Sequence, residues 1–235
     1  ACVPYCLYES PNDFEDDYTR ARDVFDIELT TNSIGANIDP NGYPCDWMGD
    51  YESTSRLLDR LVTNTSGEPL IMCFAAGNER GGANCGLGTY RCMSVPAGAK
   101  NIITVGATTS TDGSASFSSW GPTDDGRTKP EVCATGVSVT STIPGGGYAD
   151  MSGTSMSTPA TAGTTCLILE QWHILFPGAP DPLLSALGKV RRIELEKETG
   201  RQGEEIEKML DEMEQAGKFG DIPKPINVVK EKPSK

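Results

Sequence analysis

The stretch that most restricts the fold is Gly-Thr-Ser-Met-Ser-Thr-Pro at residues 153–159, which runs into an alanine-rich apolar segment ending near Glu170. Apolar residues recur there at spacings of three and four, as on one face of an α-helix. The sequence therefore predicts a helix with Ser155 at its start, where unpaired backbone amides and the helix dipole favour negative charge. Pro159 is close enough to this start that its missing amide costs little. The small apolar face is predicted to be buried, and its members are Met156, Ala160, Gly163 and Leu167.

Ser155 has two interpretations. A serine at the start of a helix is commonly an N-cap, whose hydroxyl satisfies a free backbone amide. The same free amides also stabilise the anion that forms when a hydroxyl attacks a carbonyl. The seven-residue string resembles the serine motif of the subtilisin-like serine proteases, or subtilases. This resemblance implies that Ser155 is the nucleophile of a peptide-cleaving enzyme.

Shorter segments predict the surrounding fold. Leu70–Ala75 is apolar throughout and too short for a helix, which favours a buried parallel strand. Tyr51–Thr63, just before it, carries a helical apolar stripe. The polar side chains of that helix expected to face solvent are Arg56, Asp59 and Arg60. Further strands are predicted at residues 27–31 and 101–107. Strands that alternate with helices indicate an α/β fold with a mostly parallel sheet, and ligands bind at the carboxyl ends of such strands.

The segment after the predicted strand at residues 70–75 includes Ala75-Ala76-Gly77-Asn78-Glu79 and resembles the oxyanion segment of the subtilases. An asparagine after a glycine is, on its own, equally typical of a turn. In the family, the asparagine amide donates a hydrogen bond to the substrate carbonyl oxygen as it becomes an anion. The resemblance implies this role for Asn78. It also implies that the substrate contacts Ala75, Ala76 and Gly77.

Residues 32–35, Asn-Ser-Ile-Gly, follow the strand predicted at 27–31 and are similar to the strand end by which subtilases hold the substrate backbone. Pairing of this kind gains main-chain hydrogen bonds without demanding a particular substrate sequence. The alternative is an ordinary strand followed by a glycine turn. The resemblance implies that Ser33, Ile34 and Gly35 bind the substrate. Other segments that match the family in order, and are expected to be scaffold, are Val95–Ala97, Phe117–Pro122 and Lys129–Val132.

No residue of this chain is assigned as the base that a serine nucleophile needs. In the subtilases the Asp and the His that activate the serine both precede it in sequence. The one histidine, His173, follows Ser155 by 18 residues, which on a single helix is a separation of about 27 Å. His173 is therefore predicted to be a surface residue at a helix end. No upstream Asp has the family's Asp-Ser-Gly or Asp-Thr-Gly context. The resemblance implies a domain that lacks its amino-terminal part, and that part is a predicted partner.

Charge and composition divide the chain near residue 188. Residues 1–188 contain 9 Lys and Arg against 22 Asp and Glu, whereas residues 189–235 contain 11 of each. All eight cysteines lie in the first part, and the second has no Tyr or Trp. We therefore predict two domains. The resemblance implies that residues 1–188 are an incomplete three-layer subtilisin-like α/β domain, and residues 189–235 are expected to form a charged helical extension with a loose tail.

The cysteines suit an exported protein, and their connectivity is left open. Six residues separate Cys85 from Cys92, a spacing that permits a local disulfide. The cysteines expected to be small buried apolar residues are Cys73, Cys133 and Cys166. A single histidine and the absence of zinc-ligand spacing argue against a zinc site.

The acidic stretch before residue 18 is predicted to be a loop, with turn residues at Pro11-Asn12-Asp13 and a short helix after it at 19–26. Ordinary solvation of its carboxylates is the first expectation, and a structural calcium ion is the alternative. No cofactor is expected to be required for the chemistry.

Net charge sets limits on partners. The value of −13 argues against nucleic acid, because phosphate binding needs a basic face. The absence of an apolar stretch near 18 residues argues against a membrane span, and no signal peptide is recognised. We expect an extracellular serine endopeptidase that acts on polypeptides through an acyl-enzyme on Ser155 and is inactive or weakly active alone. Two hypotheses stay open beside it: a non-catalytic peptide-binding module, and a truncated fragment without a function of its own.

Overall fold

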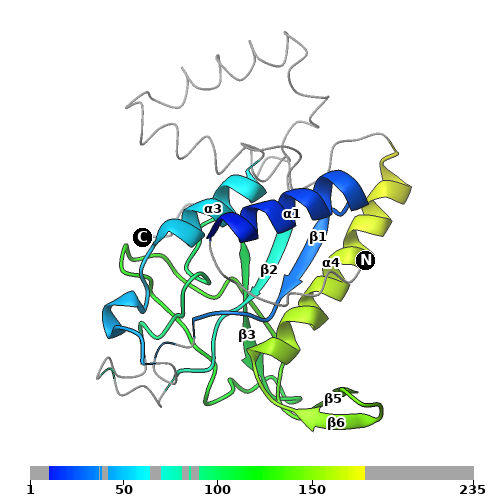
Figure 1. Cartoon of the computed structure of the whole chain (residues 1–235). Coiled ribbons are helices and arrows are strands. Elements are labelled where there is room, and N and C mark those ends of the chain that lie inside the picture. The colour runs from blue at the N-terminus through cyan, green and yellow to red at the C-terminus, as the bar shows by residue number, and fades with distance from the viewer. Residues whose placement is uncertain are drawn as a thin grey trace, which may run out of the picture. The chain divides into compact units, whose positions relative to one another are not determined.

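The computed structural model describes residues 11–36, 38, 42–63, 70–80, 85 and 90–177. Its main sheet has four parallel strands in the order β1-β2-β3-β4 (Figure 1). These strands are β1 (Leu29–Asn32), β2 (Ile71–Ala75), β3 (Ile103–Thr108) and β4 (Val132–Thr135). All five residues of β2 are buried, as expected for a strand with a neighbour on each side and helices over its faces. The α/β fold with a mostly parallel sheet is confirmed.

Helices lie on both faces of this sheet. α1 (Pro11–Phe25) and α3 (Ser53–Val62) lie on one face, and α4 (Thr154–Leu175) lies on the other (Figure 1). Ala162 of α4 packs against a cluster that includes Leu29 of β1, whereas Tyr18 of α1 donates a hydrogen bond to Asn32 of the same strand. Side chains alternate between the two faces of a strand, so Leu29 and Asn32 point in opposite directions. The result is the three-layer arrangement predicted from the sequence.

By its contacts the chain divides into two compact units, Ala1–Ile168 and Leu169–Lys235. Several predictions fall outside the described residues: the boundary at 188, the helical extension at 189–235, and the part of the amino-terminal loop before Pro11. They stay predictions. In the described part of the chain, no helix combines the length and the apolar character needed to cross a membrane.

The amino-terminal loop predicted over residues 11–17 is wrong, because α1 begins at Pro11. Proline is well tolerated in the first turn of a helix, where its missing amide would have had no partner. Phe14, Tyr18 and Ala21 then recur at helical spacing, and all three are buried. Glu15 lies on an exposed part of the helix and pairs with Arg60 at 3.1 Å. Among the described residues, no group of three or more His, Cys, Asp or Glu side chains is arranged to hold a metal ion.

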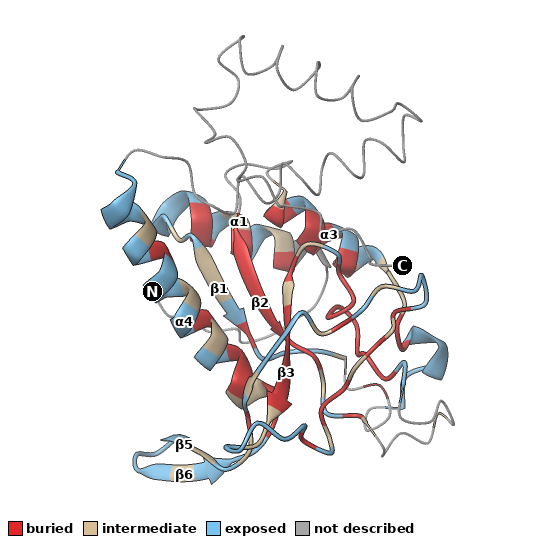
Figure 2. Ribbon diagram, turned by 180° about the vertical axis from the view of Figure 1, so that it is seen from behind, coloured by how far each residue is buried: buried red, intermediate tan, exposed pale blue. Residues whose placement is uncertain are grey.

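The predicted burial of the small apolar face of α4 is also wrong. Met156 is half-buried, Ala160 and Gly163 are exposed, and Leu167 is 66% exposed (Figure 2). The residues of α4 that pack inward include Ser157, Thr158 and Ala162 instead. Periodicity identifies an apolar face but not what covers it. In the described part of the chain nothing covers this one.

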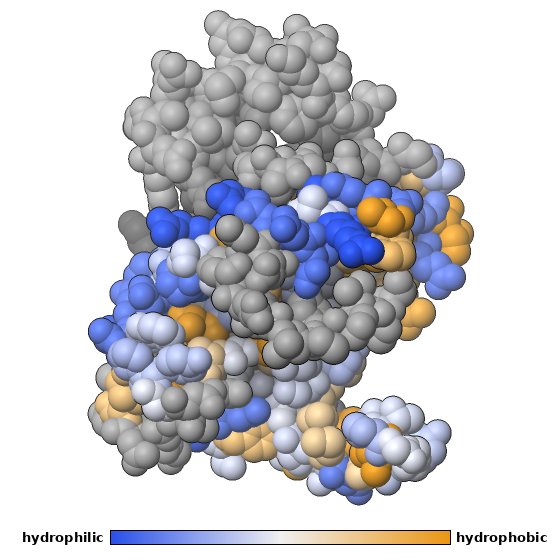
Figure 3. Space-filling view, in the orientation of Figure 1, coloured by the Kyte–Doolittle hydropathy of each residue, from blue (hydrophilic) through white to orange (hydrophobic). Residues whose placement is uncertain are grey.

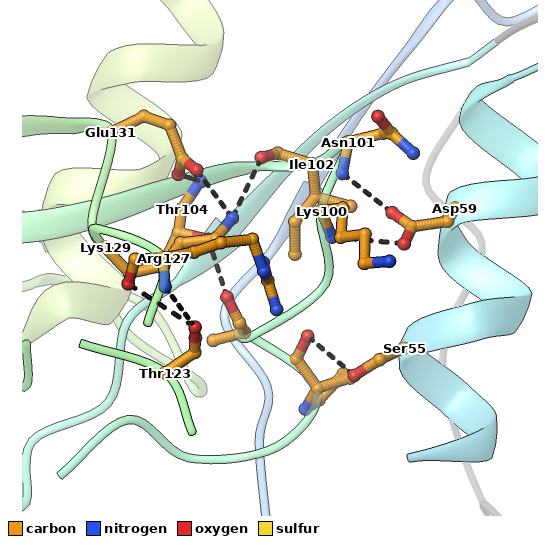
Figure 4. Close-up of polar contacts among 12 residues, drawn as sticks. Ser55, Asp59, Lys100, Asn101, Ile102, Thr104, Thr123, Arg127, Lys129 and Glu131 are labelled. Carbon is orange, nitrogen blue, oxygen red and sulfur yellow. Dashed lines mark hydrogen bonds and ion pairs between the residues drawn. The ribbon is translucent and has the colours of Figure 1, made fainter. Parts of the chain in front are cut away.

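Asp59 of α3 was expected to face solvent and is buried. Its carboxylate accepts hydrogen bonds from the backbone amides of Lys100 and Asn101 (Figure 4). It also accepts one from the Tyr51 hydroxyl at 2.6 Å. The two amides fix the segment that enters β3 to the helix that covers the sheet. The apolar stripe predicted for this helix is confirmed, since Leu57, Leu58, Leu61 and Val62 are all buried.

A second polar cluster ties β3 to the segment before β4. The buried Lys129 ammonium contacts the Glu131 carboxylate at 2.6 Å and donates to the Thr104 hydroxyl at 3.0 Å (Figure 4). Burial lowers the pKa of Lys129, and the nearby Glu131 charge opposes that effect. The two clusters together fix α3 and the segment before β4 to β3 and the residues that enter it.

The cysteines depart from the predictions in two ways. Cys85 forms a disulfide with Cys45, 40 residues away, and not with Cys92. Cys133 and Cys166 are exposed, because β4 is the outer strand of the described sheet and Cys166 lies on the outward side of α4. Only Cys73 behaves as predicted. Burial raises the pKa of the Cys73 thiol to about 11, so the thiol stays protonated at neutral pH.

β5 (Val139–Thr142) and β6 (Tyr148–Met151) form an antiparallel hairpin that leads directly into α4. Figure 3 shows the hairpin as the lobe at the lower right, where apolar atoms lie among paler ones. Tyr148 is 74% exposed and Met151 50% exposed. The hairpin therefore places apolar side chains in solvent only a few residues before Ser155.

We expect the substitution Gly136→Ala to destabilise the loop before α4. A Cβ on Gly136 would lie 2.7 Å from the Gly153 carbonyl oxygen and 2.8 Å from the Ala107 Cβ. Relieving such contacts requires backbone movement, which typically costs about 1–3 kcal/mol. The matched control is Gly163→Ala, because nothing lies within 4 Å of that Cβ and alanine is favoured over glycine in a helix by about 1 kcal/mol. Urea unfolding should show the first variant less stable, and the second more stable, than the parent. Equal stability of Gly136→Ala and the parent would contradict the packing described.

Candidate active site

Ser155 lies in the first turn of α4 and is half-buried. The loop before it is fixed by two backbone hydrogen bonds. The Gly153 amide donates to the Gly136 carbonyl at 2.8 Å, and the Met156 amide donates to the Gly153 carbonyl at 3.0 Å. The first-turn amides of α4 are therefore presented at a rigid edge of the molecule, where they favour negative charge.

Asn78 follows the carboxyl end of β2, and its side chain is oriented by Thr154. The Asn78 Oδ1 accepts a hydrogen bond from the Thr154 amide at 2.9 Å and one from the Thr154 hydroxyl at 3.1 Å. Because both donors must face an oxygen, this network assigns the carbonyl end of the Asn78 amide toward Thr154. The Nδ2 donor is directed away from Thr154.

The donors of Asn78 and Ser155 border one small space above Gly153. A methyl group on the Gly153 Cα would lie 3.4 Å from Asn78 Nδ2, 3.6 Å from the Ser155 amide nitrogen and 3.6 Å from the Met156 sulfur. The two residues are 77 positions apart in sequence, so the fold alone brings them together. An anionic oxygen near this point would have two N–H groups within reach.

Ser33 is joined to the same site through a carbonyl that Pro159 leaves without its helical partner. In a regular helix the amide of residue 159 would donate to the carbonyl of residue 155, but proline has no amide hydrogen. The Ser33 hydroxyl donates to this Ser155 carbonyl at 2.9 Å. The proline was expected to cost little because it lies near the helix start. The structure adds that its missing bond is replaced by a contact from the end of β1.

The other predicted substrate-binding residues divide into two groups. Ser33, Ile34 and Gly35 are exposed at the end of β1, as an edge that pairs with an extended peptide must be. Ala75 and Ala76 are buried, and the Ala76 amide already donates to the Val105 carbonyl. The side chains of these two alanines therefore line the core rather than the surface.

Gly77 connects the second group to the site. Its φ is +103°, a conformation that favours glycine, and a Cβ there would lie 3.1 Å from the hydroxyl oxygens of Ser94 and Ser119. The Gly77 amide donates to the Thr154 hydroxyl at 3.2 Å. The glycine thus permits the turn that carries Asn78 from β2 to Thr154. Substrate binding by residues 33–35 and 75–77 stays a prediction.

Two residues of this neighbourhood were not singled out from the sequence. The first is Thr154, whose hydroxyl contacts both Asn78 and Gly77. Its position next to Ser155 in the serine motif was the sequence feature that could have identified it. The other, Ser119, bonds to the backbone on both sides of Asn78. A serine in a predicted scaffold segment gave no sign of that contact.

No base is brought to Ser155 in the described part of the chain. His173 is exposed and lies near the last turn of α4, whereas Ser155 lies in the first turn. The placement of His173 at the exposed end of a helix is confirmed. The described residues thus place Asn78 next to the Ser155 amide and leave His173 at the other end of the helix.

Comparison with known proteins gives one consistent result. The model of the subtilase family matches residues 20–181. Subtilisin E of Bacillus subtilis (strain 168) is 38% identical over 117 residues, which cover 50% of this chain and 28% of that protein. Alkaline serine exoprotease A of Vibrio alginolyticus is 35% identical over 136 residues, covering 57% of this chain and 23% of that protein. The chain thus spans only about a quarter of the length of these curated relatives.

Solved structures resemble the fold more distantly. The self-cleaved protease domain of PatA aligns with a TM-score of 0.56 at 24% identity, over 74% of this chain and 56% of that one. The prenylagaramide maturation protease PagA aligns with a TM-score of 0.54 at 23% identity, over 77% and 57%. At this level of identity the likeness concerns the fold alone.

Proposed function

The chain belongs to the subtilase family, and from this we propose that it is the serine-bearing part of an endopeptidase that cleaves polypeptides. Ser155 is the nucleophile, and Asn78 Nδ2 and the Ser155 amide hold the oxyanion. The observation that carries the proposal is the shared space above Gly153, which lies within 3.4–3.6 Å of both donors. A serine that were only an N-cap would not need a side-chain amide from the loop after β2 next to its own amide.

The chemistry follows from this arrangement. The Ser155 hydroxyl oxygen attacks the substrate carbonyl carbon, its proton passes to a base, and the carbonyl electron pair moves onto the oxygen. The two N–H groups stabilise that oxyanion before the carbon–nitrogen bond breaks and the protonated amine leaves. Water then attacks the acyl-enzyme ester by the same route. The product is a free carboxylate, and Ser155 is regenerated.

We propose that the base comes from a polypeptide segment that precedes this region in the family. Two features support this proposal: the single histidine is remote from Ser155, and the apolar face of α4 is exposed from Ala160 to Leu167. A segment that packed on this face would also approach the helix start. Without it, the remaining rate would come from the oxyanion site and from substrate binding.

The substrate class is an extended polypeptide bound along residues 33–35, and the compartment is extracellular. The exposed end of β1 offers backbone groups beside the carbonyl of Ser155, which Ser33 already contacts. The disulfide between Cys45 and Cys85 supports an oxidising compartment, since disulfides persist mainly in secreted proteins.

A fluorophosphonate probe tests the proposal. The Ser155 oxygen forms a bond to phosphorus, fluoride leaves, and the hydroxyl proton passes to solvent or base. We expect mass spectrometry to find the label on Ser155, slowly for the chain alone, and no label on the Ser155→Ala variant. Labelling of other serines at the same rate would contradict the assignment. Peptide affinity without any labelling would instead indicate a non-catalytic peptide-binding module.

A further inference from the structure

Asn78 is held from both sides by one buried residue outside the motifs. The Ser119 amide donates to the carbonyl of Gly77 at 2.9 Å, and the Ser119 hydroxyl oxygen accepts the amide of Glu79 at 3.0 Å. Ser119 is completely buried. The peptide units before and after Asn78 are therefore both fixed to a single side chain and its backbone.

This turn needs such support because β2 ends before it. The last residue of β2 is Ala75, and Gly77 then adopts a φ of +103° that no strand would maintain. The Asn78 side chain is itself exposed. Thr154 holds its oxygen, but a bond at that end does not prevent the backbone from rotating. The position of Nδ2 depends on the two peptide units that Ser119 fixes.

Ser118 provides an internal comparison. It is buried like Ser119, but its hydroxyl accepts the amide of Ala107 in β3 at 2.9 Å. Ser118 therefore anchors the segment to the sheet, whereas Ser119 anchors the turn that carries Asn78. Each of these two adjacent buried serines accepts a hydrogen bond from one backbone amide. Only the amide bound by Ser119, that of Glu79, lies next to Asn78.

We propose that Ser119 is a positioning residue for the oxyanion donor: its hydroxyl and amide hold the Gly77–Glu79 turn so that Asn78 Nδ2 points at the space above Gly153. This inference rests on the proposed function, since it assigns Ser119 a part in that same site. Removal of the hydroxyl leaves the buried Glu79 amide without its acceptor. The turn then relaxes and moves the donor out of place.

The test combines hydrogen exchange with fluorophosphonate labelling of the full chain. We expect Ser119→Ala to lower the labelling rate of Ser155 by about tenfold, since displacement of a catalytic group by about 1 Å can cost 10²-fold. Protection of the Glu79 amide should fall as well. The matched control, Ser118→Ala, should label within about threefold of the parent and keep the Glu79 amide protected. Ser119→Cys keeps the volume with a weak acceptor and serves in place of Ser119→Ala if that variant fails to fold.

A double variant separates positioning from general loosening of the fold. If Ser119 acts through Asn78, then Asn78→Ala combined with Ser119→Ala should label no more slowly than Asn78→Ala alone. Two results would overturn the inference and leave the proposed function in place. One is that the two substitutions slow labelling independently, so that their effects multiply in the double variant. The other is that Ser119→Ala labels at the parental rate although Asn78→Ala is slow. Parental labelling by Asn78→Ala would instead remove the proposed oxyanion site, and the inference with it.

Discussion

Replacement of Asn78 by alanine should slow the phosphonylation of Ser155 by about 10²- to 10³-fold. This magnitude is carried over from subtilisin itself, where removal of the corresponding asparagine donor has that effect on turnover. The physical reason is that Nδ2 is one of two N–H groups directed at the space above Gly153. Its loss leaves the developing anion with the Ser155 amide alone. The rate of adduct formation is measured by mass spectrometry at fixed probe concentration.

A second substitution at the same position sharpens this prediction. Asn78→Asp retains an oxygen for the two bonds from Thr154 but replaces the donor by a charged acceptor, so it should be at least as slow as Asn78→Ala. The control is Thr164→Ala on the exposed side of α4, whose hydroxyl bonds only to the Ala160 carbonyl. It should label like the parent. Parental labelling by Asn78→Asp would show that Asn78 donates nothing to the adduct.

Supplying the proposed base from a second polypeptide should accelerate labelling of Ser155 by about 10²- to 10⁴-fold, the usual contribution of general-base catalysis. The base is supplied by adding a polypeptide that corresponds to Subtilisin E outside its matched region, which is 28% of that protein. The acceleration is expected because the chain's one histidine is remote from Ser155. The same rate measurement reports it, with and without the added segment.

Two controls separate the chemistry from the docking. A segment with its histidine changed to alanine should give no acceleration, and an equal effect would show that no base is transferred. Leu167→Glu, which places a charge on the exposed face of α4, should abolish the effect of the segment but leave the slow labelling by the chain alone unchanged. Free imidazole provides a base without docking, so the rate increase it gives should be insensitive to Leu167→Glu.

The features that could be predicted were those set by local pattern. Short apolar runs predicted the strands of the parallel sheet, because a strand buried on both faces must be apolar throughout. The apolar stripe at residues 51–63 predicted α3, the helix that covers the sheet. The motifs gave Ser155, Asn78 and Ser33. The structure brings these three residues together around the start of α4. Their catalytic and binding roles stay predictions.

The features that could not be predicted depend on partners distant in sequence. Asp59 is buried because two amides some 40 residues later donate to it, and a helical pattern cannot show those donors. The disulfide partner of Cys85 is likewise 40 residues away. The face of α4 was predicted to be buried from its composition. Composition shows that a helix face is apolar, but it does not show whether another segment of the described residues packs on that face.

The most direct measurement of the central claim is a crystal structure of the chain carrying a peptide phosphonate on Ser155. The convergence of Asn78 Nδ2 and the Ser155 amide above Gly153 predicts a phosphonyl oxygen about 2.7–3.1 Å from both nitrogens. The peptide should lie along residues 33–35. An adduct whose phosphonyl oxygen points into solvent, with Asn78 bonded elsewhere, would contradict the claim.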